Sequence, residues 1–66
     1  MTGREPQLAD ATRAWRAMFG DRLPRNDEDL NDALFHEASE QANTVALVVR
    51  RLGFETFLSA LKREPQ

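Results

Sequence analysis

Three residues with metal-binding or acid–base side chains stand four apart in the sequence, Asp32, His36 and Glu40. On a continuous helix this spacing would place them along one face, and histidine with carboxylates can bind zinc or iron. The spacing does not match the Glu-x-x-His motif of di-iron bundles, and a single helix supplies three ligands poorly. We therefore predict no metal site and no cofactor, and we interpret the three side chains as a solvated helix face.

No other set of residues predicts catalysis. Ser39 and Ser59 lack a base and an orienting residue that the sequence could place beside them. The three glycines do not form a phosphate-binding loop. Enzymatic activity is therefore not expected.

Acidic residues are concentrated in one stretch of the chain. Residues 27–40 contain six carboxylates and no Lys or Arg, whereas basic residues stand on both sides of them. Such a stretch is either a solvated helix face or a surface that attracts a basic partner. The candidate partner-binding residues of this acidic face are Asp29, Asp32, His36, Glu37 and Glu40.

Residues 45–49, Val-Ala-Leu-Val-Val, would make a helix apolar on nearly all sides. Val45, Val48 and Val49 fall on the stripe that should face the core, and Leu47 points nearly the opposite way. A helix of this kind is usually buried on more than one side, although single exposed leucines are common on protein surfaces. The candidate interface residues are Phe35, Ala46 and Leu47.

The length of 66 residues allows one domain. A chain of this size buries only about 60% of its unfolded surface, so a monomer should be marginally stable. The sequence contains no Cys, which excludes disulfides and thiolate metal sites as additional stabilisation. We therefore expect self-association, and a symmetric homodimer is its commonest closed form.

Helical periodicity along the whole chain predicts an all-α fold, a small three-helix bundle. The spacing of apolar residues predicts a first helix over 7–19 and a last helix over 55–63. No stretch alternates with period two, so no strand is expected. Residues 7–63 should form a single helical domain, between a flexible arm at 1–6 and a tail at 64–66.

The signals between these two helices favour one long central helix over residues 27–52. Asn26 is a suitable N-cap, acidic residues follow it where the helix dipole favours them, and Gly53 marks the end. The weak point is the stretch 39–44, where Asn43 could cap a new helix. A break there would make the bundle four-helical.

The core is expected to contain the large apolar side chains of these helices. A connector over 20–26 should add Leu23 to them. The helical residues expected in the core are Leu8, Trp15, Phe19, Leu30, Leu34, Val45, Val49, Leu52, Phe57 and Leu61.

Together these features favour a non-catalytic protein–protein interaction module, such as an adaptor, an inhibitor or a small regulatory subunit. The alternative is a helix-turn-helix-like DNA-binding transcriptional regulator, because residues 49–54 and the short helix after them match the turn of that motif in outline. Ser59 and Ala60 stand where the motif needs buried aliphatic side chains, and the net charge is −2. A nucleic-acid partner is therefore not expected.

The cellular context is expected to be cytoplasmic. No apolar stretch is long enough to span a membrane, and the first residues lack the apolar core of a signal peptide. The absence of Cys is consistent with a reducing compartment. The expected partners are therefore another protein and a second copy of the chain, not a membrane.

Overall fold

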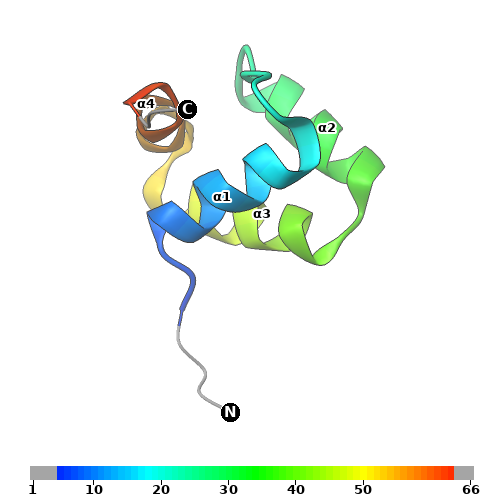
Figure 1. Cartoon of the computed structure of the whole chain (residues 1–66), viewed down its shortest axis with the longest axis horizontal. Coiled ribbons are helices and arrows are strands. Elements are labelled where there is room, and N and C mark those ends of the chain that lie inside the picture. The colour runs from blue at the N-terminus through cyan, green and yellow to red at the C-terminus, as the bar shows by residue number, and fades with distance from the viewer. Residues whose placement is uncertain (1–4, 64–66) are drawn as a thin grey trace.

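A computed structural model of the chain describes residues 5–63. Within that range the chain forms α1 (Leu8–Phe19), α2 (Asp27–Glu37), α3 (Glu40–Leu52) and α4 (Phe54–Arg63), without a strand (Figure 1). The prediction of an all-α fold is confirmed. The predicted tail at 64–66 and the first four residues of the predicted arm lie outside the described residues.

The predicted long helix over residues 27–52 is wrong, because α2 ends at Glu37. Ala38 adopts the left-handed conformation, with φ 48° and ψ 46°, and its N–H donates to the carbonyl oxygen of Leu34 at 3.0 Å. This conformation costs an alanine about 1–2 kcal/mol. It usually belongs to Gly or Asn, so an alanine at this position does not indicate a helix end.

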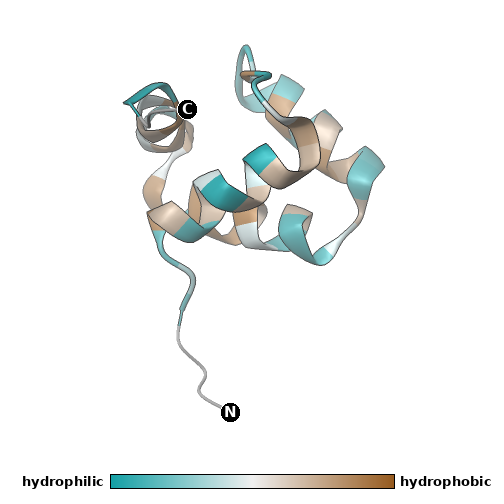
Figure 2. Ribbon diagram, viewed as in Figure 1, coloured by the Kyte–Doolittle hydropathy of each residue, from teal (hydrophilic) through white to brown (hydrophobic). Residues whose placement is uncertain are grey.

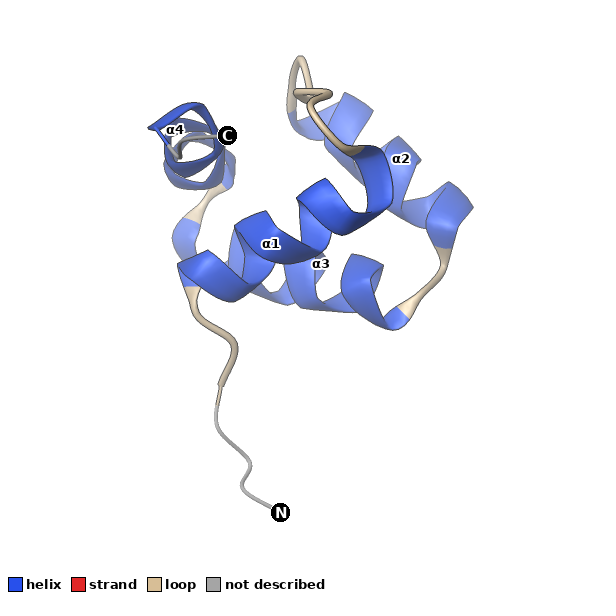
Figure 3. Cartoon of the chain, viewed as in Figure 1, coloured by secondary structure: helices blue, strands red, loops and turns tan. Residues whose placement is uncertain are grey.

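A new helix begins directly after this residue. The Oγ of Ser39 accepts a hydrogen bond from the backbone N–H of Ala42 at 3.2 Å, as an N-cap does. The described chain therefore has four helices, which is the alternative that the stretch 39–44 had left open. The residue that caps the new helix is Ser39 and not the predicted Asn43. Figure 3 shows the short connection between α2 and α3.

The other predicted helix ends are confirmed. Asn26 caps α2, its side chain accepting a hydrogen bond from the N–H of Asp29 at 2.7 Å. Gly20 and Gly53 have φ values of 67° and 98°, which only glycine adopts without strain, and they follow α1 and α3.

The core forms where α3 packs against α1, α2 and α4. In Figure 1, α2 and α4 lie on opposite sides of the pair formed by α1 and α3. Figure 2 shows that hydrophobic (brown) and hydrophilic (teal) stretches alternate along the helices, as expected for amphipathic helices. Trp15 and Phe57 are fully buried and meet edge to face, with ring centroids 6.0 Å apart. Leu30, Val45 and Val48 are also fully buried.

Two polar contacts tie segments of the chain to this core. The indole N–H of Trp15 donates to the carbonyl oxygen of Arg22 at 2.7 Å, so the buried ring fixes the connector between α1 and α2. The guanidinium of Arg16 donates to the carbonyl oxygen of Leu61 at 2.8 Å, near the end of α4. That carbonyl is one of those that lack a partner within a helix.

Two predicted core residues are instead exposed. Leu23 points to solvent, and Pro24 is the buried residue of the connector. Leu52 is also exposed, because it is the last residue of α3 and lies one turn beyond Val48, the last buried residue of that helix. Leu8, Phe19 and Val49 are partly buried and pack against the core.

The left-handed residue provides a test of the break between α2 and α3. We expect Ala38→Gly to raise the free energy of unfolding by up to about 1 kcal/mol, because glycine removes the left-handed strain but has a more disordered unfolded state. Urea denaturation would measure the change. As a control, Ala17→Gly, at an exposed position near the end of α1, should lower the free energy of unfolding by about 1 kcal/mol. A loss of similar size at residue 38 would contradict the break.

Candidate interaction surface

The break between α2 and α3 divides the predicted acidic face. Asp32 and His36 stay one turn apart on α2, with Oδ1 and Nε2 separated by 3.6 Å and side chains that are 72% and 73% exposed. Glu40 begins α3, so the predicted line of three residues on one helix is not formed. Within residues 5–63, no group of three or more His, Asp or Glu is arranged to hold a metal ion.

Asp29 differs from the other acidic candidates because its carboxylate contacts the connector. The side chain is 14% exposed and accepts hydrogen bonds from the backbone N–H of Arg25 at 2.9 Å and from the guanidinium of Arg22 at 3.3 Å. The backbone N–H of Arg25, followed by the charges of the two guanidiniums, lowers the pKa of Asp29 below its ordinary value of 3.8. The carboxylate of Asp29 is therefore engaged within its own chain, unlike the exposed acidic side chains of the same face.

The apolar candidates lie beside a groove between α2 and α3. Phe35 is 80% exposed and Leu47 is 54% exposed, whereas Ala46 is partly buried. The groove has a volume of about 620 Å³. Its lining residues are Asn31, Leu34, Phe35, Ala38, Ser39, Glu40, Ala42, Asn43 and Ala46. The structure therefore brings together Phe35 and Ala46, which are distant in the sequence.

Leu47 stands at the edge of this groove. It follows the lining residue Asn43 by four positions, which places the two side chains one above the other on α3. The exposed side of Leu47 thus continues the apolar surface of the groove along α3.

The charges around the groove are acidic on α2 and at the start of α3, whereas Arg50 follows Ala46 by four positions and so lies on the same side of α3. Glu40 is the one ionisable residue among those that line it. On α2, Glu28 and Asp32 precede Phe35 by seven and three positions, a spacing that places them on the same side of the helix. Lys and Arg are absent from the lining residues.

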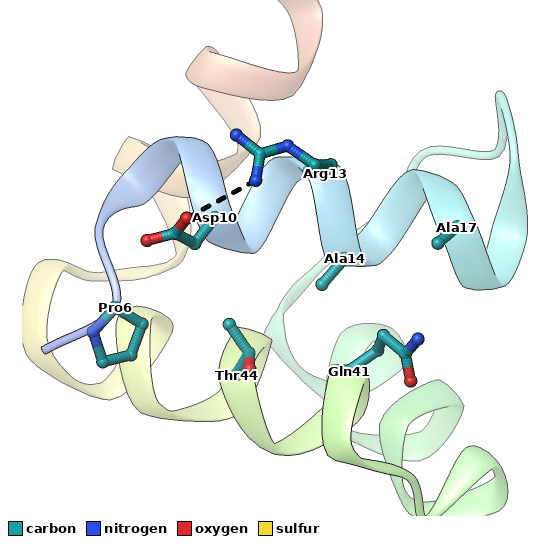
Figure 4. A pocket seen from close by; sticks show the side chains of 7 residues that line it. All are labelled: Pro6, Asp10, Arg13, Ala14, Ala17, Gln41 and Thr44. Atoms are coloured by element: carbon teal, nitrogen blue, oxygen red, sulfur yellow. Dashed lines mark ion pairs between the residues drawn. The ribbon is translucent and has the colours of Figure 1, made fainter. Parts of the chain in front are cut away.

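A second pocket, of about 540 Å³, lies between α1 and α3 (Figure 4). Asp10 and Arg13 stand at its edge and form an ion pair at 3.6 Å. The other lining residues are Pro6, Ala14, Ala17, Gln41 and Thr44. None of these residues was predicted to form a binding site, because alanines on a helix do not indicate one. The lining contains no nucleophile paired with a base, so it has no evident catalytic chemistry.

The connection between α3 and α4 differs from the outline of a DNA-binding motif. Gly53 alone separates the two helices, whereas a helix-turn-helix has a turn of three or four residues. In α4, Phe57, Ala60 and Leu61 are buried, while Ser59 is exposed. The exposed side chains of this helix are Glu55, Thr56, Ser59, Lys62 and Arg63, and its first turn, where base contacts would be made, carries the acidic Glu55.

Comparisons with known proteins found no significant match to this chain. No family model matches it, and neither a curated protein nor a solved structure shows significant similarity to it. Among the described residues, no helix combines the length and the apolar character needed to cross a membrane.

The contacts of Asp29 predict how stability changes with pH. Because folding lowers the pKa of Asp29, its stabilising contribution is present above pH 3.8 and is lost as the pH falls through the lower pKa of the folded state. We expect Asp29→Asn to be less stable than wild type at pH 6 and the difference to shrink below pH 3.8. Thermal unfolding at several pH values would measure it.

Asp32→Asn is the matched control, since this carboxylate is on the same helix but 72% exposed. Its stability should stay close to that of wild type at pH 6. If the two variants lost the same stability, the internal contacts of Asp29 would have no special role.

Proposed function

We propose that this chain is a non-catalytic protein–protein interaction module that binds another protein through the groove between α2 and α3. We define the groove surface as the apolar residues Phe35, Ala46 and Leu47 together with the acidic side chains next to them. Those side chains, with the neighbouring histidine, are Asp32, His36 and Glu40, whereas the predicted Glu37 is exposed at the end of α2 and does not line the groove.

The exposure of Phe35 is the observation that carries this proposal. The fold buries Trp15 and Phe57 completely and packs Phe19 and Phe54 against the core, yet Phe35 is 80% exposed. An aromatic side chain beside an apolar groove is a typical anchor of a protein interface. Burial of Phe35 therefore requires a second molecule.

The same surface supports the expected kinds of activity. A module of this size acts by occupying a surface of its partner, as an adaptor, an inhibitor or a small regulatory subunit does. We propose that it works in the cytoplasm. The single-residue connection at Gly53 does not favour the DNA-binding alternative.

The proposal requires the groove surface to be dispensable for folding. We expect Phe35→Ser and Leu47→Glu each to change the free energy of unfolding by less than about 0.5 kcal/mol, since both side chains are largely exposed. Circular dichroism and urea denaturation would measure this. Phe57→Ala is the contrasting variant, and it should cost about 3–5 kcal/mol or prevent folding, because Phe57 is fully buried. A large loss at Phe35 or Leu47 would assign these residues to the core.

The binding itself is tested by photo-crosslinking in the native cell. A photoreactive aromatic amino acid in place of Phe35 or Leu47 should form an adduct with the same partner, identified by mass spectrometry. The matched control position is Lys62, exposed on α4. Addition of Leu47→Glu should abolish the adduct formed from position 35. Equal adducts from all three positions, or none, would contradict the proposal.

A further inference from the structure

We propose that the groove between α2 and α3 receives a basic amphipathic helix of a partner protein. Its apolar side chains would contact Phe35, Ala46 and Leu47, and its Lys or Arg side chains would face Glu40 and Asp32. This inference rests on the proposed function, because it names the partner class of the same surface.

The shape of the groove fits a helix. The lining residues of α3 run from Glu40 to Ala46, which is nearly two turns or about 10 Å. Ala42 and Ala46, one turn apart, carry no side chain beyond Cβ and allow a partner backbone to come close. Residues 5–63 contain no strand, so they offer no sheet edge to which an extended peptide could be added. Insertion of an amphipathic helix into an apolar groove is a common mode of protein recognition, and it uses apolar anchors at helical spacing.

The charge of the surface fits a basic helix. Within the described part of the chain, Glu28, Glu37 and Glu40 form no ion pair, and the partner of Asp32 is His36 on its own helix. These carboxylates are exposed and attract Lys and Arg side chains at short range. Because the lining of the groove holds no Lys or Arg, a helix with acidic residues beside its apolar stripe would meet unfavourable charges.

The same charges disfavour a second copy of this chain in the groove. A symmetric contact through this surface would place the same patch of the two copies face to face. Asp32 and Glu40 of both copies would then lie in one interface, and like charges across an interface are unfavourable. A partner of opposite charge avoids this repulsion.

The partner class can be tested with a library of random 16-residue peptides displayed on phage and selected against the full chain. We expect enriched peptides to carry apolar residues at i, i+3 or i+4, and i+7, with a net positive charge. Fluorescence anisotropy with the synthetic peptides would then measure their affinity. Phe35→Ser and Leu47→Glu should each weaken binding at least tenfold.

Two single-carboxylate variants separate local charge recognition from general attraction. Glu40 and Glu55 are both exposed and both lie in the first turn of a helix, but only Glu40 lines the groove. We expect Glu40→Gln to weaken binding of the enriched basic peptides about threefold, as the loss of a partly exposed ion pair does. Glu55→Gln should leave the affinity unchanged, and a rise in salt should reduce the effect of Glu40→Gln.

The outcomes separate this inference from the proposed function. Peptides that need Phe35 and Leu47 but are neutral or acidic would overturn the basic helix and retain the interaction surface. A selection without enriched peptides would also overturn it, and a doubled mass by light scattering that Leu47→Glu abolishes would then identify a second copy as the occupant. Basic peptides that bind Phe35→Ser and Glu40→Gln as tightly as wild type would overturn it as well. The photo-crosslinking from positions 35 and 47 decides the proposed function in each case.

Discussion

The left-handed backbone at Ala38 determines where every later part of the chain can lie. A straight helix over residues 27–52 would extend about 39 Å, beyond the longest dimension of the molecule, 34 Å. The change of direction between α2 and α3 instead lets Leu30 and Val45 reach the same core. Full burial of one such side chain contributes about 1.5–3 kcal/mol. Two of them therefore exceed the cost of about 1–2 kcal/mol for left-handed alanine.

The position of α2 also depends on the connector that precedes it. Trp15 holds the connector by a hydrogen bond to the carbonyl oxygen of Arg22, and the guanidinium of that residue contacts Asp29 at the start of α2. The buried indole of Trp15 thus influences the position of α2, although the two are separated in the sequence. Since the groove lies between α2 and α3, its shape depends on this chain of contacts at one end and on Ala38 at the other.

The sequence predicted those parts of the fold whose signals are local. Asn26, Gly20 and Gly53 mark helix ends by their own chemistry, and the apolar spacing placed α1 and α4 nearly correctly. The end of α2 was missed because alanine is a good helix former and carries no signal of a left-handed turn. The inward role of Asp29 was missed for another reason: its partners come from the connector, and only the folded chain brings them to the carboxylate.

The candidate surface was predicted in its residues but not in its geometry. Leu47 stood out because its spacing turned it away from the core stripe, and Phe35 because it extended the edge of that stripe; both are exposed. The sequence predicted both residues on one continuous helix. Such a helix has no groove, and it gives Glu40 no reason to lie beside Phe35. That arrangement follows only when Ala38 separates α2 from α3.

Under the proposed function, folding and recognition would use different residues, which would explain why an aromatic side chain is exposed on so small a protein. An exposed apolar patch promotes association of identical copies as readily as binding of a partner. The carboxylates around Phe35 oppose the association of identical copies and favour the binding of a partner that is basic. The apolar side chains would supply most of the binding energy, and the acidic ones would determine which molecule can use it. A partner helix with apolar side chains but no basic ones, or with basic side chains but no apolar ones, would bind weakly.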